Sequence, residues 1–214
     1  GDCTDTDLAR LGVDRALELL EVLVNYKAVI TSNITYIDTR ALYPSVVRKM
    51  IDAVLKTGDA SLTPLAAVAG AVSDEIGDFL FQQSGVSKVI VNNGGDIAIR
   101  LRPGYTANIG INLDYAGREI PYILTLSSEV CGVTTSGFGG RSFTKGIASA
   151  ATIWAETASI ADALSTVRRE HAGGGVRRPC RATAARTGRV QRRRLVPGQP
   201  GRGALRDLHQ GIHP

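Results

Sequence analysis

The stretch Asn92-Asn93-Gly94-Gly95-Asp96 interrupts a run of residues that otherwise reads as one continuous β-strand. The β-branched residues Val89-Ile90-Val91 precede it, and the alternating residues Ile97-Ala98-Ile99 follow it. Asn-Gly between two such runs is a strong hairpin signal, and a β-bulge is the alternative turn structure. Two adjacent glycines within a strand pattern also mark places where a ligand or another backbone comes close. The pattern therefore predicts two strands joined by either a simple turn or a binding loop.

Three segments with apolar residues at helical spacing precede these strands. Residues 7–29 form the first segment. The second begins at Ser45, a candidate N-cap, and ends at Gly58, a candidate C-cap. The third covers residues 63–85 and starts with the small-residue run 65–72. A helix face this small allows close approach of a cofactor, and tight packing against a sheet explains it equally well.

A second glycine-rich region follows the predicted strand 129–133. Its residues are Thr134-Thr135-Ser136-Gly137-Phe138-Gly139-Gly140-Arg141-Ser142. N–H and O–H groups of such a loop can surround an anion or phosphate, and a plain surface hairpin is the alternative. The region does not match the Walker A pattern. Further strands are expected near residues 105–113, 119–127 and 150–154.

A helix is expected over residues 157–166, with Thr157 or Ser159 as its N-cap. Asp162 and Thr166 are four residues apart and would therefore share one helix face. A carboxylate and a hydroxyl on a shared face can ligate a hard cation such as Mg²⁺. Alternatively, Thr166 bonds its own backbone and Asp162 faces solvent.

The basic charge is confined to the end of the chain. The formal net charge is +5, but residues 168–214 carry 12 Arg against two acids, which leaves residues 1–167 with a net charge of −5. All three histidines also lie beyond residue 167, so residues 1–167 contain no His-based catalytic triad and no His-ligated zinc site. With its net negative charge, this part of the chain is not expected to bind nucleic acid.

Three widely separated cysteines form no disulfide framework or metal-ligand spacing. We therefore expect a reducing compartment and a cytoplasmic location. No stretch of about 18 apolar residues is present, so no membrane partner is expected. No signal peptide is visible at the start of the sequence, although one can have been removed.

Four motifs occur together in an order and spacing that resemble ApbE-like proteins, and most closely the small, functionally uncharacterised branch of that superfamily. They are the Ala-rich run 65–72, Val91-Asn92-Asn93-Gly94-Gly95-Asp96, Thr134-Thr135-Ser136-Gly137 and Ala161-Asp162-Ala163-Leu164-Ser165-Thr166. The resemblance covers about residues 40–167. It implies an α+β fold of the ApbE type, related to the T-fold, in which helices pack on a mixed sheet formed by residues 1–167.

The better understood branch of this superfamily handles FAD with Mg²⁺ and transfers FMN to a threonine of an acceptor protein. By resemblance, Asp162, Thr166 and the backbone carbonyl near Ala69 would bind Mg²⁺. The nucleotide, FAD or FMN, would lie against Asn93, Gly94, Gly95, Asp96, Thr135, Ser136 and Gly137. A metal that bridges the phosphates would neutralise their charge at the bond that breaks.

Two departures from the transferase pattern concern its chemistry. The transferases carry a histidine after the Thr-Ser-Gly motif, where this chain has Arg141-Ser142-Phe143, and their helix motif contains a lysine that is missing here. The resemblance therefore implies a flavin-nucleotide binding protein, and it leaves open whether flavin transfer or FAD pyrophosphate cleavage is its activity. The alternative is a non-enzymatic scaffold that keeps the fold without binding a nucleotide.

Residues 168–214 are rich in Arg, Gly and Pro and contain no aromatic residue. Such a composition cannot bury a core. We interpret this tail as an out-of-frame reading of GC-rich coding sequence that lies outside the native fold. A basic arm for nucleic acid, favoured by Arg192-Arg193-Arg194, is the alternative.

Overall fold

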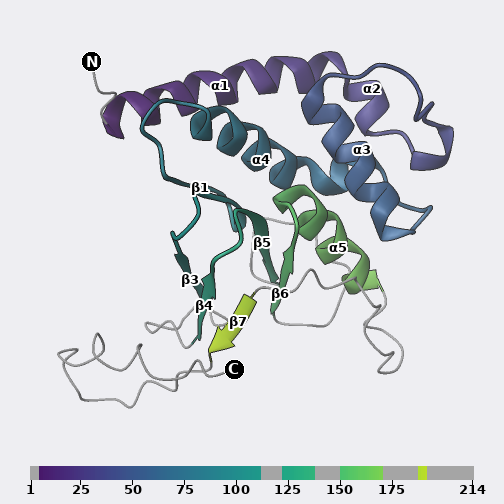
Figure 1. The fold of residues 1–214 in the computed structure, drawn as a ribbon. Helices are drawn as coiled ribbons and strands as arrows, with labels where there is room; N and C mark the ends of the chain where they lie inside the picture. Colours follow the sequence, from purple (N-terminus) through teal and green to yellow (C-terminus); the bar gives the residue numbers. More distant parts are fainter. Residues whose placement is uncertain (1–4, 112–121, 138–149, 171–187, 192–214) are drawn as a thin grey trace.

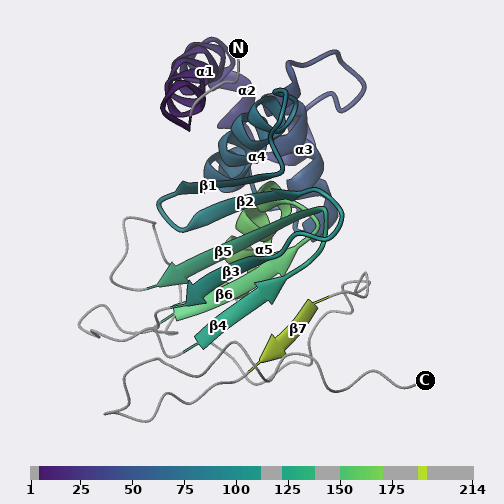
Figure 2. The same ribbon diagram turned by 60° about the vertical axis from the view of Figure 1, so that its left-hand side comes forward.

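The computed structural model describes residues 5–111, 122–137, 150–170 and 188–191. A layer of helices covers one face of a four-stranded antiparallel sheet, and a smaller sheet packs on the opposite face (Figures 1 and 2). The α+β class predicted from the sequence is confirmed. The specific ApbE-type fold and its relation to the T-fold remain predictions.

Five α-helices are present in the described part of the chain. They are α1 (Asp5–Asn25), α2 (Lys27–Ile30), α3 (Ser45–Thr57), α4 (Val68–Phe81) and α5 (Ala158–Glu170). Short 3-10 turns lie at Ile34–Tyr36 and Pro64–Ala67. The chain turns at Tyr26 and thereby divides the predicted segment 7–29 between α1 and α2. Helix α3 contributes many side chains to the helical core, since its Val46, Val47, Met50, Ile51 and Val54 are fully or almost fully buried.

Two predicted helix ends differ in outcome. Gly58 follows α3 in the left-handed conformation, with φ of 71°, as expected for a glycine C-cap. Ser45 does not cap this helix: Pro44 occupies the N-cap position, and the Ser45 hydroxyl donates to the carboxylate of Glu75 on α4. The predicted cap was wrong because a charged acceptor from another helix competes for the hydroxyl.

The larger sheet has the strand order β1-β2-β5-β6. Its strands are β1 (Lys88–Asn93), β2 (Asp96–Leu101), β5 (Val130–Gly137) and β6 (Ala150–Ala155). Every strand pair in the described residues is antiparallel, which corrects the expected mixed sheet. Antiparallel strands can be joined by very short connections, and only Gly94 and Gly95 separate β1 from β2.

The smaller sheet has the order β3-β4-β7. Its strands are β3 (Ala107–Ile111), β4 (Tyr122–Leu126) and β7 (Gly188–Gln191). The two sheets share a second core, formed by Ile99, Leu101, Ala107, Ile109, Leu124, Leu126, Cys131 and Val133. Its members alternate along each strand, as expected for sheets that pack face to face.

Two described segments lie beyond residue 167. Helix α5 continues to Glu170, and the backbone of residues 188–191 pairs with β4. The domain boundary at residue 167 and the out-of-frame interpretation of residues 168–214 stay predictions. Among the described helices, none combines the length and the apolar character needed to cross a membrane.

Candidate functional site

The peptide group between Ala69 and Gly70, in the first turn of α4, is where three of the four motifs meet. The Asn93 side chain at the end of β1 donates from Nδ2 to the Ala69 carbonyl at 3.3 Å. The Gly70 N–H donates to Asp162 Oδ2 on α5 at 3.0 Å. Asn93 and Asp162 are 69 positions apart in the sequence, and they contact the two ends of one peptide group.

Glycine at position 70 allows α4 and α5 to approach this closely. A Cβ atom at Gly70 would lie only 2.2 Å from the carbonyl oxygen of Ala158. Gly132 on β5 plays the same part below α5, since a Cβ there would lie 2.0 Å from the Ala158 nitrogen. The first turn of α5 is thus held against one helix and one strand at backbone contact distance.

The 92–96 stretch forms a two-residue hairpin turn, which confirms the turn interpretation of its backbone. Gly94 and Gly95 have φ values of 67° and 113°, which residues with side chains rarely adopt. The Asn92 side chain accepts from the Gly95 N–H at 2.9 Å. The Thr135 N–H donates to the Gly95 carbonyl at 3.1 Å, so the turn contacts the end of β5. A Cβ at Gly94 would meet no atom within 4 Å, which leaves this side of the turn open.

The predicted loop 134–142 is wrong in its first four residues. Thr134–Gly137 continue β5 and pair with Ala150–Ile153 on β6. Cross-strand pairing to a second long strand overrides the loop tendency of glycine and hydroxyl residues. Residues 138–142 lie outside the described residues, as does the side chain of Ser136.

The pleat of the sheet separates Thr134 from Thr135. Gly132 faces the helices, so Thr134, two residues further along, faces them too, next to its strand partner Asp96. Thr135 points to the other face, and its hydroxyl lies 3.0 Å from that of Thr152. Thr134 is 1% exposed, and its Oγ1 has no hydrogen-bond partner among the described residues. Thr134, and not Thr135, therefore lies on the face of the sheet that α5 and its Asp162 cover.

The remaining predicted site residues also lie close to α4 and α5. The Asp96 carbonyl accepts from the Ser73 hydroxyl of α4 at 2.8 Å. Thr166 and Asp162 share a face of α5, and the Thr166 hydroxyl donates to the Asp162 backbone carbonyl at 3.3 Å. This contact is the bond that a threonine can make to its own helix backbone.

The residues near Ala69 fit Mg²⁺ in chemical type, because carboxylate, carbonyl and hydroxyl oxygens are its usual ligands. In their described positions, however, two of these oxygens point apart. The Ala69–Gly70 peptide is trans, so its C=O and N–H point in opposite directions, and Asp162 Oδ2 lies on the N–H side. Asp162 would have to rotate away from Gly70 to share a cation with the Ala69 carbonyl. No group of three or more His, Cys, Asp or Glu side chains suited to a metal occurs among the described residues.

The family model described as AbpE bacteria matches residues 4–187. This chain belongs to that family.

Similar curated proteins include the UPF0280 proteins of Methanopyrus kandleri, Methanosphaerula palustris and Methanosphaera stadtmanae. The first is 38% identical over 108 residues, which are 48% of this chain and 40% of the relative. The second is 37% identical over 130 residues, 58% of this chain and 51% of the relative. The third is 32% identical over 154 residues, 68% of this chain and 59% of the relative. The chain thus spans about half the length of the curated relatives that it matches.

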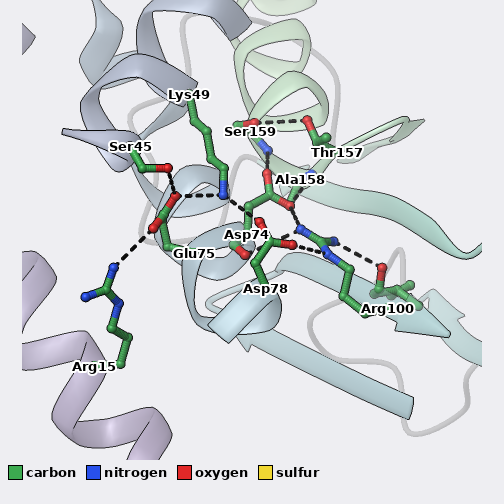
Figure 3. Close-up of polar contacts among 11 residues, drawn as sticks. Arg15, Ser45, Lys49, Asp74, Glu75, Asp78, Arg100, Thr157, Ala158 and Ser159 are labelled. Carbon is green, nitrogen blue, oxygen red and sulfur yellow. Dashed lines mark hydrogen bonds and ion pairs between the residues drawn. The ribbon is translucent and has the colours of Figure 1, made fainter. Parts of the chain in front are cut away.

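The AbpE-family chain also contains a buried ion pair, which the sequence interpretation missed. Asp74 on α4 is fully buried and receives Arg100 Nη2 at 2.9 Å from β2 (Figure 3). The same carboxylate accepts from the backbone N–H groups of Ala158 at 3.1 Å and Ser159 at 2.8 Å. Asp74 thereby supplies a negative charge to the N-terminus of α5, in addition to the Thr157 hydroxyl that accepts from the Ile160 N–H at 3.3 Å.

Two further carboxylates of α4 extend this network to other elements. Asp78 receives Arg100 Nε at 2.6 Å and Lys49 Nζ from α3 at 2.6 Å. Glu75 receives Lys49 at 2.7 Å and Arg15 of α1 at 3.3 Å (Figure 3). Alternation along β2 was the available signal, because it places Arg100 on the helix-facing side together with Ala98.

The network shifts the acidities of the carboxylates on α4. Burial raises the pKa of Glu75, but hydrogen bonds from Lys49 and Ser45 outweigh burial and leave the pKa below its ordinary value. The pKa of Asp78 is likewise raised by burial and lowered, on balance, by Arg100 and Lys49. Both groups are therefore held as carboxylates that stabilise the helix layer, and neither is suited to act as a general acid near neutral pH.

Cys131 does not provide a nucleophile in this family member. Its side chain lies in the core between the two sheets, and burial raises the pKa of its thiol to about 11. A thiol with this pKa is almost entirely protonated at neutral pH.

Proposed function

We propose that the chain binds a flavin nucleotide where the β1–β2 turn, the start of α4 and the end of β5 meet. One observation carries this proposal: Asn93 and Asp162, which the ApbE resemblance assigns to the nucleotide and the metal, contact the same Ala69–Gly70 peptide. Independent structural elements supply the two side chains, so no local sequence pattern requires them to meet.

The surroundings of this peptide suit a nucleotide. Gly94 leaves the outer side of the turn without a side chain, so a planar or charged group can approach the backbone. The Thr134 hydroxyl is buried and has no hydrogen-bond partner among the described residues, and a ligand phosphate or hydroxyl would satisfy it.

Magnesium fits the proposal as a second ligand. Ala69, Asp162 and Thr166 would hold the ion through a carbonyl, a carboxylate and a hydroxyl oxygen, and it would neutralise the pyrophosphate of FAD. To bind the ion, the Asp162 side chain would have to give up its hydrogen bond to the Gly70 N–H. Because the ion would offset the negative charge of the phosphates, Mg²⁺ and nucleotide should bind cooperatively.

We propose binding as the main function, with FAD pyrophosphate cleavage or FMN transfer to an acceptor protein as the activity to be tested. The histidine and lysine of the transferase pattern are missing from this sequence. A transfer reaction would thus have to use other residues.

Titration of the full chain with FAD and with ADP, each with and without Mg²⁺, tests the proposal. We expect FAD to bind and Mg²⁺ to increase its affinity. The Asp162→Asn variant should lose most of this increase, because a hard dication needs the negative charge. Asp52→Asn is the matched control, since Asp52 is an exposed carboxylate on α3 and should leave binding unchanged.

The assay also follows release of FMN and AMP, which reports pyrophosphate cleavage. The proposal is contradicted if the folded chain binds neither FAD nor ADP, with or without Mg²⁺. FAD binding that Mg²⁺ does not change would support the nucleotide site and contradict the metal site.

A non-enzymatic scaffold is the second candidate, and the Asp162–Gly70 hydrogen bond favours it. On this view Asp162 serves α4 as Asp74 serves α5, by accepting backbone N–H groups. Stability of the Asp162→Asn variant without metal separates the two candidates, as argued in the Discussion.

A further inference from the structure

Four apolar side chains are exposed on α1. Val13, Leu17, Leu20 and Val24 are between 54% and 71% exposed. They follow one another at intervals of four, three and four residues, the spacing of a heptad stripe. At a rise of 1.5 Å per residue the stripe is about 16 Å long.

This stripe is not the face by which α1 joins the protein. Leu19 and Leu23 of the same helix are buried in the helical core. A Cβ at Gly12 would meet Leu80 and Ile76 of α4 at 3.4 and 3.7 Å. Helix α1 is the outermost helix in both ribbon views, with the other helices on one side of it (Figures 1 and 2). The four apolar side chains consequently form a second face with no described partner.

One edge of the stripe is acidic. At 100° per residue, Asp14 and Glu21 lie beside Leu17, with Arg10 as the one base on this edge of α1. Ala9 and Ala16 form the other edge. The charge thus follows one side of the apolar surface rather than surrounding it.

This distribution of charge decides between partners. Two antiparallel copies of α1 would place Asp14 and Glu21 of one copy against the same acids of the other. Two parallel copies would place these acids against Ala9 and Ala16, which offer no opposite charge. An anionic membrane surface would repel the acidic edge.

We propose that the outer face of α1 binds an amphipathic helix of another protein, one whose apolar heptad stripe is edged with Lys or Arg. Such a helix covers the four apolar side chains and places its bases against Asp14 and Glu21. The two helices pack as a short coiled coil, in which edge charges select the partner.

The test uses the full chain and a synthetic three-heptad peptide with Leu at the two core positions and Lys along one edge. A second peptide carries Glu in place of each Lys. We expect the Lys peptide to bind at least about tenfold more tightly than the Glu peptide, and we expect its affinity to fall as the NaCl concentration is raised. Leu17→Gln combined with Leu20→Gln should lower this affinity at least about tenfold, because both side chains would be buried by the partner.

Matched variants separate this interface from general attraction between charges. Asp14→Lys combined with Glu21→Lys should reverse the preference between the two peptides. Leu42→Gln changes an almost fully exposed leucine outside α1 and should leave binding unchanged. Circular dichroism establishes that each variant is folded.

Three results with the peptides or with the chain alone would overturn the proposal. They are equal binding of the two peptides, peptide binding that survives the two Leu→Gln changes, and self-association of the chain that Leu17→Gln abolishes. The last result would assign the face to a second copy. Binding to vesicles of anionic lipid in preference to the Lys peptide would likewise contradict it.

Discussion

A single peptide group, between Ala69 and Gly70, joins three segments that are distant in the sequence. Its carbonyl meets Asn93, its N–H meets Asp162, and its glycine Cα faces the backbone of Ala158. The Asp162 contact depends on the missing side chain at position 70, because Gly70 sets how closely α5 can lie. Two substitutions test this point at the scale of single residues.

Gly70→Ala and Gly77→Ala form a matched pair on α4. A Cβ at position 70 would lie 2.2 Å from Ala158, whereas one at position 77 would lie 3.6 Å from the Ala98 Cβ, an ordinary contact. We expect Gly70→Ala to lower the free energy of unfolding by about 3 kcal/mol or more, since backbone cannot move aside as a side chain can. Gly77→Ala should raise it by up to about 1 kcal/mol through helix propensity. Urea denaturation measures both, and equal effects would contradict the described approach of α4 and α5.

Asp162→Asn tests the role of the Asp162 carboxylate in the absence of metal. If the carboxylate accepts the Gly70 N–H in solution, the neutral amide should lower the free energy of unfolding by about 1–2 kcal/mol, because bonds to charged acceptors are the stronger kind. If Asp162 is mainly a metal ligand, the empty site should be as stable or more stable without the charge. Denaturation in the presence of a chelator distinguishes the two results.

At the scale of elements, α5 begins where three other elements hold its first turn. Asp74 of α4 binds two of its N–H groups, Gly132 of β5 lies directly beneath it, and Arg100 of β2 neutralises Asp74. The Asp74 carboxylate thus caps the N-terminus of α5 from another helix. The start of α5 is fixed by tertiary contacts as well as by its own Thr157.

Asp74→Ala removes both roles at once. We expect a loss of about 3 kcal/mol in the free energy of unfolding, because two N–H groups at the start of α5 lose their acceptor and the buried Arg100 keeps only the half-exposed Asp78 as an ion-pair partner. Asp52→Ala is the control, since its pair with Arg48 is exposed and should be worth only about 0.5 kcal/mol. Chemical denaturation at neutral pH measures both variants. A loss below about 1 kcal/mol for Asp74→Ala would mean that the ion pair does not hold α5.

At the scale of the whole molecule, one chain of charges connects the helix layer to the sheet. It runs from Arg15 of α1 through Glu75, Lys49 and Asp78 to Arg100 of β2 (Figure 3). The carboxylates all come from α4, and the bases come from the elements around it. Their combined effect on stability should therefore depend on pH.

Acidification should destabilise the protein through Glu75 and Asp78. Folding lowers both pKa values, so the stability that they contribute is complete above their ordinary values of 4.5 and 3.8 and is lost as the pH falls through and below them. We expect the free energy of unfolding to fall more steeply below pH 4.5 in the native chain than in Glu75→Gln. Urea denaturation at a series of pH values, with Asp52→Asn as the control for a general charge effect, measures the difference. Parallel curves for the native chain and Glu75→Gln would show that Glu75 contributes no pH-linked stability.

Local pattern was sufficient to predict most helices and strands of this protein. Apolar spacing along 45–58 and 157–166, and the break at Gly94-Gly95, depend on residues that are near one another in the chain, and α3, α5 and the β1–β2 turn all form there. The sequence also predicted that Asp162 and Thr166 share a helix face, which follows from helix geometry alone. Ser45 was misassigned because its acceptor, Glu75, lies 30 residues away.

Only the tertiary structure decided which of these residues lie together. Pairing of β2 with β5 sets a register in which Thr134, and not Thr135, faces the helices, and a shift by one residue would reverse this. The same pairing places Arg100 beneath Asp74 and Gly132 beneath Ala158. Such contacts depend on the order of strands in the sheet and on distances between backbones. Neither quantity is encoded in the periodicity of a single segment.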